Sequence, residues 1–393
     1  MAYEDHDDER TARLHDGRAW DDFCDTLKVA GRITLRETAD HADPVDRVEG
    51  FRYLSRIFFM ATARGLDRRT PVGEQFIGLI PPPLKGGIGV QSPNQDHIVQ
   101  PVDPRYRYRI KGTAGTTYTH LSAWSPPVPE DVGAFATGMD AESFVASFNP
   151  NRATTPHTAV LASLAADDGS VDFVLSVDDP GDGHVWMPMA PNTRELMGRV
   201  VWEDRQHRVP PRLTIECLDP HEEPDPPTPA DMSARLAIAS QLLLGMVSDY
   251  AGWTAELRTR ENQLGRTDDW YERIGGSPDD RHFEFGYYRV PEGHALVVEF
   301  TEPATQHWNF QLCNHWMENL ADYAKGEGYV DKENAVRDGD RVRIVVAHDD
   351  PGVPNWLRPD GRDHGVMGLR FVQPDTPPQV SCRLVPVGEV TSV

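Results

Sequence analysis

Polar and aromatic residues alternate from residue 307 to residue 316, where the sequence reads His-Trp-Asn-Phe-Gln-Leu-Cys-Asn-His-Trp. In an extended strand, the imidazole and amide side chains at 307, 309 and 311 share one face, and the apolar ones share the other. Amides and imidazoles hydrogen-bond neutral hydroxyls, and aromatic rings stack on the carbon faces of sugars or sterols. We therefore expect a ligand site with these members: His307, Trp308, Asn309, Asn314 and Trp316. The alternative is that these groups satisfy buried backbone at a domain junction.

Turnover of the ligand would need a general base, and only imidazole titrates unaided near neutral pH. His315 lies inside this run, and His348 directly precedes Asp349. These three residues form the predicted catalytic set, and the nearby Asn355 is predicted to bind the ligand. No metal ligands and no cofactor are predicted.

The Asp-Asp-Pro-Gly run at 349–352 has a competing interpretation. The same four residues occur at 178–181, where no histidine precedes them. A feature present twice is more simply a turn, because Asp, Pro and Gly preset turn dihedrals and cap free amides. Acid–base work and divalent-metal binding at 348–350 are the alternatives.

Arginines alternate with apolar residues from 105 to 110 and so share one face of a predicted strand. Arg107 and Arg109 are predicted to lie across the cleft, where a guanidinium could pair with an anionic group of the ligand. In so acidic a chain, the alternative is that they pair with internal carboxylates.

Helical periodicity precedes each of two strand-rich regions. Apolar stripes predict a helix that begins near Trp20 and ends at Gly31, and another over 44–63. Thr228 as N-cap and Pro229 at the first helical position predict a long helix that ends near Arg260. Period-two patterns predict strands over 106–110, 118–124, 158–164, 171–177, 195–201, 213–218, 283–290, 295–300, 308–312, 342–347 and 366–371.

The two strand-rich regions contain an internal repeat. Residues 171–181 match 342–352 at an offset of 171, and Trp186 and Trp356 follow at an offset of 170. An ordered series of matches predicts a mainly β fold with helical additions (α+β). The expected architecture is two related jelly-roll-like β-sandwich modules in tandem, with N-terminal helices and one long helix between the modules.

Two shorter matches extend the repeat: Met-Gly at 197–198 with 367–368, and Tyr-Arg-Ile at 108–110 with Tyr-Arg-Val at 288–290. The predicted organisation has five parts: a disordered acidic tail (1–18), a helical segment with a Pro/Gly-rich loop (19–104), the first β-sandwich module (105–219), an acidic Pro-rich linker (220–230), and a helix with the second module (231–393).

The segments 307–316 and 345–357 resemble a bacterial family, domain-of-unknown-function family 1214, which is often paired with family 1254. The resemblance extends to 20–31, 47–54 and 106–115, so it covers most of the chain. It implies a C-terminal β-sandwich of jelly-roll type and no established reaction. Members often show a Gly-x-Asp-Asn-Pro-Asp-Asn-like stretch ahead of the Tyr-Arg-Ile strand, whereas this chain reads Gln-Ser-Pro-Asn-Gln-Asp-His at 91–97.

Composition narrows the function classes for this chain of 393 residues. Its 39 Lys+Arg and 62 Asp+Glu give a net charge of −23, which disfavours binding to nucleic acids or to an anionic membrane surface. No apolar run is long enough for a membrane span, and residues 1–20 do not look like a secretory signal. The four cysteines are far apart and predict reduced thiols. A soluble, cytoplasmic protein is expected.

These patterns predict a protein that binds a neutral, partly apolar, hydroxylated small molecule, such as a lipid-like alcohol or a sugar, between its two modules. If it turns the ligand over, it is a cofactor-independent lyase or hydrolase. One alternative is a carbohydrate-active enzyme that pairs Asp349 or Asp350 with Glu299 or Glu318. Another is a non-catalytic assembly protein. A homo-oligomer is compatible with each of these.

Overall fold

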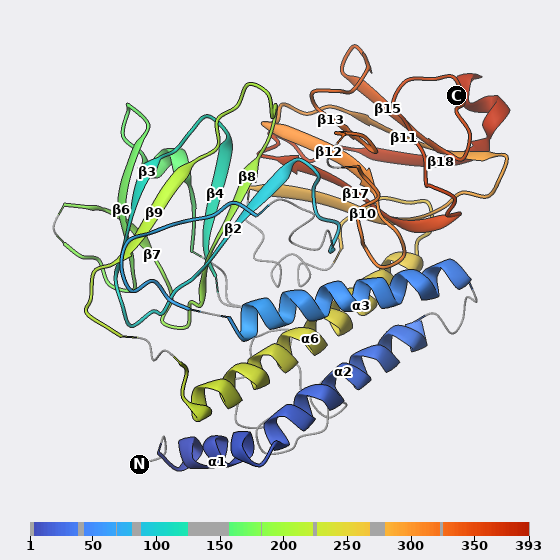
Figure 1. Ribbon diagram of the computed structural model, residues 1–393. Coiled ribbons are helices and arrows are strands. Elements are labelled where there is room, and N and C mark those ends of the chain that lie inside the picture. The colour runs from blue at the N-terminus through green and yellow to red at the C-terminus, as the bar shows by residue number, and fades with distance from the viewer. Residues whose placement is uncertain are drawn as a thin grey trace.

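Two β-sandwiches lie side by side on a layer of helices in the computed structural model (Figure 1). The structure describes residues 4–37, 43–67, 69–80, 88–124, 157–181, 183–222, 226–267, 280–322 and 325–392. Within these ranges, no helix has both the length and the apolar character that crossing a membrane requires. The predicted α+β class is confirmed.

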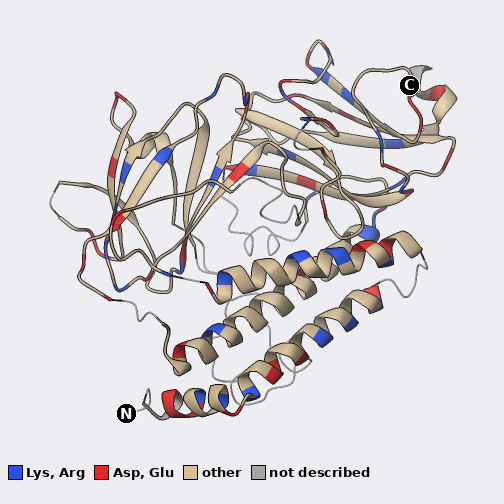
Figure 2. Ribbon diagram, viewed as in Figure 1, with Lys and Arg blue, Asp and Glu red and all other residues tan. Residues whose placement is uncertain are grey.

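The helical layer contains four α-helices in the described part of the chain: α1 (Glu4–His15), α2 (Arg18–Glu37), α3 (Pro44–Gly65) and α6 (Pro229–Arg258). The Asp43 carboxylate caps α3 by accepting a hydrogen bond from the Val45 amide at 2.8 Å. The predicted start of α6 is confirmed, because Thr228 and Asp231 form a reciprocal capping box. Figure 2 shows acidic and basic residues interspersed along α1, α2 and α3.

Two features of the helical layer differ from the prediction. Residues 4–15 of the predicted disordered tail form α1, whose Leu14 packs on a cluster that contains Phe23 and Leu236. Gly31 does not end α2, which continues to Glu37. Tertiary packing overrides the weak helix propensity of glycine here, because the neighbouring Ile33 is buried in the core between the helices.

The first sandwich consists of two sheets, which include two strands, β1 and β2, that the prediction placed in a loop. One sheet has the order β1 (Gln75–Phe76), β9 (Arg212–Cys217), β3 (Tyr108–Thr113), β6 (Ser170–Ser176), β7 (Val185–Pro188). The other has the order β2 (Gln95–Pro101), β8 (Glu195–Val201), β4 (Tyr118–Trp124), β5 (His157–Val160), and a 3-10 helix follows at Leu161–Leu164. Because β1 and β2 belong to it, the sandwich begins well before residue 105. Residues 223–225 of the predicted linker lie outside the described residues.

The second sandwich has the same plan. One sheet has the order β10 (Arg281–Arg289), β17 (His364–Val372), β12 (His307–Leu312), β13 (Tyr329–Asp331). The other has the order β14 (Arg337–Asp338), β15 (Arg341–Ala347), β11 (His294–Thr301), β18 (Val380–Pro386), with β16 (Trp356–Leu357) parallel to β15. The described chain ends in a 3-10 helix at Val387–Ser392.

The internal repeat is visible in the strand order. Strands β2 to β9 correspond in sequence to β10, β11, β12, β13, β15, β16, β17 and β18, and the pairings agree throughout. Even the parallel pair β6–β7 has its counterpart in β15–β16. The Asp-Asp-Pro-Gly segments at 178–181 and 349–352 have the same local contact. In each, an Asp carboxylate (Asp179 or Asp350) accepts a hydrogen bond from the Gly amide two residues later. The turn interpretation of Asp-Asp-Pro-Gly is therefore confirmed.

The two shorter matches do not join equivalent positions. Tyr108 lies in β3, whereas Tyr288 lies in β10, which corresponds to β2. Met197 lies on the outer face of its sheet, whereas Met367 is part of the second sandwich core. Since side chains alternate along a strand, a shift of one residue reverses the face. At the offset of 171, Arg199 of β8 corresponds to Arg370 of β17, and both point out of their sandwiches.

Candidate functional site

The outer faces of two equivalent sheets, β2-β8-β4-β5 and β10-β17-β12-β13, meet between the sandwiches (Figure 1). Hydrogen bonds cross this junction from Asn94 to Asp331 at 2.7 Å and from Ser92 to Asn309 at 3.0 Å. The guanidinium of Arg281 lies over the Tyr118 ring, 5.3 Å from its centroid. The junction therefore brings the predicted polar face of β12 against the first sandwich.

The predicted alternation along β12 is confirmed. Trp308 and Phe310 belong to the core of the second sandwich, where Trp308 packs edge-on against Phe300 with 5.1 Å between ring centroids. Trp308 therefore supports the sandwich core. His307, Asn309 and Gln311 are buried on the opposite face, toward the first sandwich.

Asn309 and Gln311 hold residues 91 and 92, at the start of the segment 91–97. The Ser92 hydroxyl donates to Asn309 Oδ1, and Asn309 Nδ2 donates to Gln311 Oε1 at 2.9 Å. Gln311 Nε2 donates to the Gln91 carbonyl at 2.8 Å. These two amides therefore do what the structural alternative expects, because they satisfy buried groups at a junction.

His307 behaves differently from the two amides. Its side chain is 1% exposed, and neither ring nitrogen has a hydrogen-bond partner in the described structure. Burial, together with the charges of Lys332, Arg281 and Arg370, lowers the pKa of His307 to about 3. The imidazole is neutral at physiological pH, with one donor and one acceptor unused.

The facing strand β4 presents further buried atoms without partners among the described residues. They are His120 Nδ1, Ser122 Oγ and Trp124 Nε1, which lie on the outer face of β4 because residues along a strand alternate. Burial lowers the pKa of His120 to about 4, and the charges of Arg281 and Arg199 add to this effect. The junction therefore has unused hydrogen-bonding capacity on both sides.

Three arginines give this junction a positive charge. Burial, with the charges of Arg281 and Arg370, lowers the pKa of Arg199 to about 9. Burial and the charge of Arg281 likewise lower the pKa of Arg370 to about 10. Asp280 pairs with Arg281 at 2.6 Å, while Arg281 Nη2 has no partner within the described ranges. Burial of the guanidinium groups is the largest cause of both lowered pKa values, and the neighbouring arginine charges add to it.

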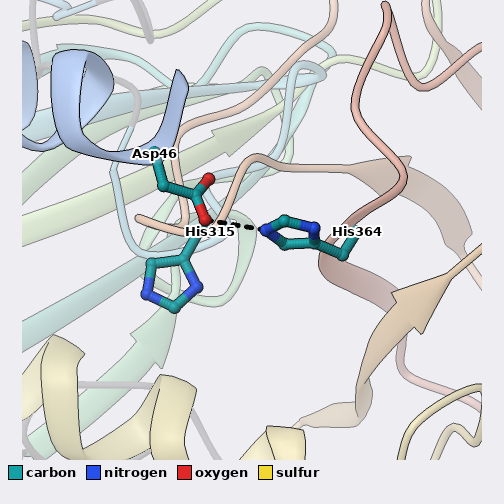
Figure 3. Close-up of side chains that lie close together, drawn as sticks. All are labelled: Asp46, His315 and His364. Atoms are coloured by element: carbon teal, nitrogen blue, oxygen red, sulfur yellow. Dashed lines mark hydrogen bonds and ion pairs between the residues drawn. The ribbon is translucent and has the colours of Figure 1, made fainter. Parts of the chain in front are cut away.

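A second buried cluster forms around His315, where α3 meets the second sandwich. Donor atoms of Asp46, His315 and His364 lie within 4.8 Å of one another (Figure 3). Asp46 Oδ2 and His364 Nε2 are 2.7 Å apart, and the Tyr287 hydroxyl is 2.9 Å from His315 Nδ1. The other ring nitrogen of His364 contacts the carboxylate of Asp363. Asp46, His315 and His364 are each at most 5% exposed.

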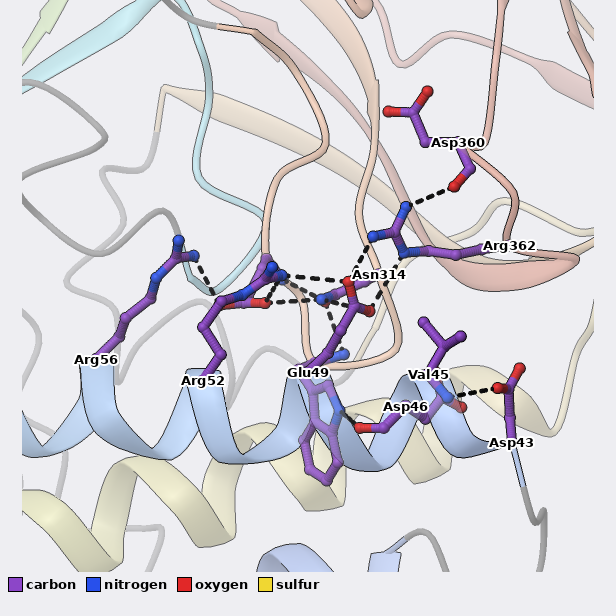
Figure 4. A network of polar contacts seen from close by, with 11 residues as sticks. Asp43, Val45, Asp46, Glu49, Arg52, Arg56, Asn314, Asp360 and Arg362 are labelled. Atoms are coloured by element: carbon purple, nitrogen blue, oxygen red, sulfur yellow. Dashed lines mark hydrogen bonds and ion pairs between the residues drawn. The ribbon is translucent and has the colours of Figure 1, made fainter.

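Two residues of the loop after β12 anchor it to α3: Asn314, which Figure 4 shows beside Glu49 and Arg52, and Glu318. The Asn314 amide donates to Glu49 at 3.0 Å and to Glu318 at 2.7 Å. Arg52 and Arg56 reach the buried Glu318 carboxylate at 2.7 and 2.6 Å. This network fixes the loop that carries His315.

Trp316 fixes the loop from the other side. Its indole nitrogen donates to the Asp46 carbonyl at 2.7 Å, and its ring stacks on Tyr53 with 5.1 Å between centroids. The ring lies so close to Gly50 that a Cβ there would be 2.6 Å from it. Asn314 and Trp316 therefore position His315 and lie at the helical junction rather than beside His307.

The structure places the other predicted residues elsewhere. His348 Nε2 donates a hydrogen bond to the Val290 carbonyl at 2.8 Å, and Asp349 is exposed in the turn. The Asn355 amide clamps neighbouring backbone at Val336 and Arg343. None of these three described residues belongs to either buried cluster.

Arg107 and Arg109 lie on β3 and its approach, in the sheet of the first sandwich that faces away from the second (Figure 1). They pair with Asp219 and Asp172 at 2.7 and 2.6 Å, as the internal-carboxylate alternative expects. Of the carboxylates considered for a carbohydrate-active enzyme, Glu299 lies on β11 and forms ion pairs with Arg343 and Arg383. Glu318 instead belongs to the α3 network.

Sequence reasoning missed Asp46, Tyr287 and the pairing of His364 with Asp46, because these residues come from three distant segments. It also missed His120 and Ser122. The period-two pattern over 118–124 put both on one strand face, and this was the only sequence feature that pointed to them.

No family model matches the sequence, and no curated protein matches it. Among solved structures, an uncharacterised protein from Burkholderia cenocepacia is 28% identical, with a TM-score of 0.82, and the match covers 97% of this chain and 100% of that one. A Vibrio parahaemolyticus protein is 10% identical, with a TM-score of 0.44, and the match covers 91% and 100% of the two chains. The chain therefore shares its fold with the Burkholderia protein over 97% of its length.

Proposed function

We propose that the chain binds a small hydroxylated organic molecule between the facing sheets of its two β-sandwiches. The observation that carries the proposal is a set of six buried polar atoms without partners in the described structure: His120 Nδ1, Ser122 Oγ, Trp124 Nε1, Arg281 Nη2 and both ring nitrogens of His307. Each buried unpaired polar atom costs about 1–3 kcal/mol. His120 and His307 both lie close enough to Arg281 for its charge to lower the pKa of their imidazoles, and we infer that this part of the junction binds a partner that the protein itself does not supply.

The chemistry of these groups indicates what the partner offers. A neutral imidazole and a serine hydroxyl each donate and accept, so they complement alcohol groups. Phe283 and Phe285 lie on the same outer face of β10 as Arg281, and Phe285 packs edge-on against Trp253 of α6. The three arginines favour oxygen acceptors, so we extend the expected ligand from a neutral alcohol to a hydroxylated molecule that also carries a carboxylate.

Binding is better supported than turnover at this junction. The lowered pKa values of His307 and His120 make both imidazoles weak proton acceptors at neutral pH. Lyase or hydrolase chemistry, a carbohydrate substrate and an assembly role stay predictions. Membership of family 1214 and a cytoplasmic location also stay predictions; the four cysteines, all free thiols in the structure, are compatible with that location.

Native mass spectrometry of freshly purified protein tests the proposal. Extra mass that is lost on denaturation, in the wild type but not in Ser122→Phe, would support it, because the larger ring fills the junction. Arg109→Met is the matched control and should keep the extra mass, since Arg109 lies on the far sheet of the first sandwich.

Added probes test the site without a co-purified ligand. Cyclohexanecarboxylate should raise the melting temperature more than cyclohexylmethanol does, and Arg281→Met should remove the difference. The proposal is refuted if the wild type releases no mass and neither probe changes the melting temperature, because water alone would then satisfy the six atoms.

A further inference from the structure

The cluster of Asp46, His315 and His364 is separate from the junction between the sandwiches. Asp46 lies in the first turn of α3, His315 follows β12, and His364 begins β17. Two imidazoles and one carboxylate from three segments converge in a buried place, with all three donor atoms within 4.8 Å of one another. Two His and one carboxylate are a ligand set that zinc and other divalent transition metals use.

We propose that Asp46, His315 and His364 bind one divalent transition-metal ion, which joins helix α3 to the second sandwich. This goes beyond the ligand site proposed above and does not depend on it. It also revises the sequence-based expectation that the chain has no metal ligands.

The surroundings of His364 provide a second observation. Its Nε2 faces Asp46, while its Nδ1 contacts the Asp363 carboxylate. Metal-bound histidines usually donate a hydrogen bond from the nitrogen that does not bind the metal to a carboxylate, a backbone carbonyl or water, which orients the ring. The same arrangement is built here around His364.

The backbone that carries the three groups is fixed by contacts other than the metal. Trp316 donates to the Asp46 carbonyl, and the Thr254 hydroxyl donates to the His315 carbonyl at 3.3 Å. The Asp46–His364 contact of 2.7 Å is shorter than the roughly 3.3 Å between ligands of a tetrahedral ion with bonds of about 2.0 Å. Binding would therefore spread this pair slightly and release the proton that it shares.

A competing set overlaps this one. Donor atoms of Asp43, Asp363 and His364 also lie within 4.8 Å of one another. Asp43 is already used as the N-cap of α3, and the side chain of Asp363 is 54% exposed. The buried set, which excludes competing water, is the better site.

Zinc titration of protein that has been treated with a chelator and dialysed tests the proposal. We expect one Zn²⁺ per chain by calorimetry and by elemental analysis after gel filtration. Co²⁺ in place of Zn²⁺ should give a visible absorption band that reports its nitrogen and oxygen ligands. Asp46→Asn and His315→Gln should each weaken binding by at least about tenfold.

Two controls separate the sites. Asp43→Asn keeps the N-cap, because asparagine caps helices as well as aspartate, but removes a ligand of the competing set. It should bind Zn²⁺ like the wild type, and so should His348→Gln. Circular dichroism of each variant without metal checks that it is folded.

The proposal is overturned if the wild type binds no Zn²⁺ or Co²⁺ at 100-fold excess over protein. It is also overturned if folded Asp46→Asn and His315→Gln keep wild-type affinity, or if Asp43→Asn alone loses the metal. Loss of metal in these variants with intact binding of cyclohexanecarboxylate would show that this site and the ligand junction are independent.

Discussion

The buried, neutral His307 should make the free energy of unfolding depend on pH, and replacing His307 should reduce that dependence. An unfolded histidine has a pKa of about 6.5, whereas the folded pKa of His307 is lowered to about 3. Below pH 6.5 the unfolded chain therefore takes up a proton that the folded site excludes. The free energy of unfolding should fall as the pH falls from about 6.5 toward 3.

The size of the effect follows from the pKa values. Between pH 7 and pH 5, the lowered pKa of His307 removes about 2 kcal/mol of stability. His120, with a folded pKa of about 4, removes a similar amount, so the two together account for about 4 kcal/mol. Other titrating groups add to the total, so the informative quantity is a difference between variants.

Urea denaturation at pH 7 and pH 5 measures that difference. In His307→Phe, the loss of stability between the two pH values should be smaller than in the wild type by about 2 kcal/mol. The exposed His184, replaced by Asn, is the control and should leave the wild-type pH dependence unchanged. An equal loss in His307→Phe and wild type would refute the reasoning, because the folded site would then accept a proton.

Three further substitutions test the packing that holds the site. Gly50→Ala would place a Cβ 2.6 Å from the Trp316 ring, so overpacking should destabilise the protein by about 1–3 kcal/mol despite the higher helix propensity of alanine; a raised urea midpoint would contradict this. Thr228→Ala removes the capping box of α6 and should cost about 1 kcal/mol by thermal unfolding, while Thr228→Ser should restore most of it. Asn355→Ala removes three side-chain hydrogen bonds and places alanine at a positive φ of 56°, so it should lower the free energy of unfolding by about 2–3 kcal/mol. Asn355→Gly in the same assay should recover only the part of this loss that comes from the positive φ, because glycine tolerates it but makes no side-chain hydrogen bonds.

Local patterns in the sequence predicted most of the fold. The capping residues Thr228 and Asp231, the alternation along β12 and the repeated turn are all properties of a few neighbouring residues, and all three are confirmed. The helix α1 was missed because its charged sequence gives a weak apolar stripe, and it is held by contacts with distant residues such as Leu236.

The sites were predicted less well because they depend on contacts across long separations. His315 was recognised as a reactive type of residue, but its partner Asp46 lies in another part of the chain. The sequence pattern predicted that Arg107 binds the ligand, because it did not show that Asp219, 112 residues away, forms an ion pair with Arg107. A strand pattern shows which face a side chain occupies but not which element covers that face.

The contact between equivalent sheets has a consequence for how this protein can change. Two copies of one surface that face each other form the isologous interface of a two-fold dimer, here within a single chain linked by α6. In a true dimer every substitution at such an interface occurs twice, and a residue near the axis lies close to its own copy. Here Arg199 is within range of the charge of its counterpart Arg370. Because this chain encodes the two halves separately, a substitution can change one side of the junction while the other side stays the same. Two similar sandwiches can therefore form a junction whose two sides differ.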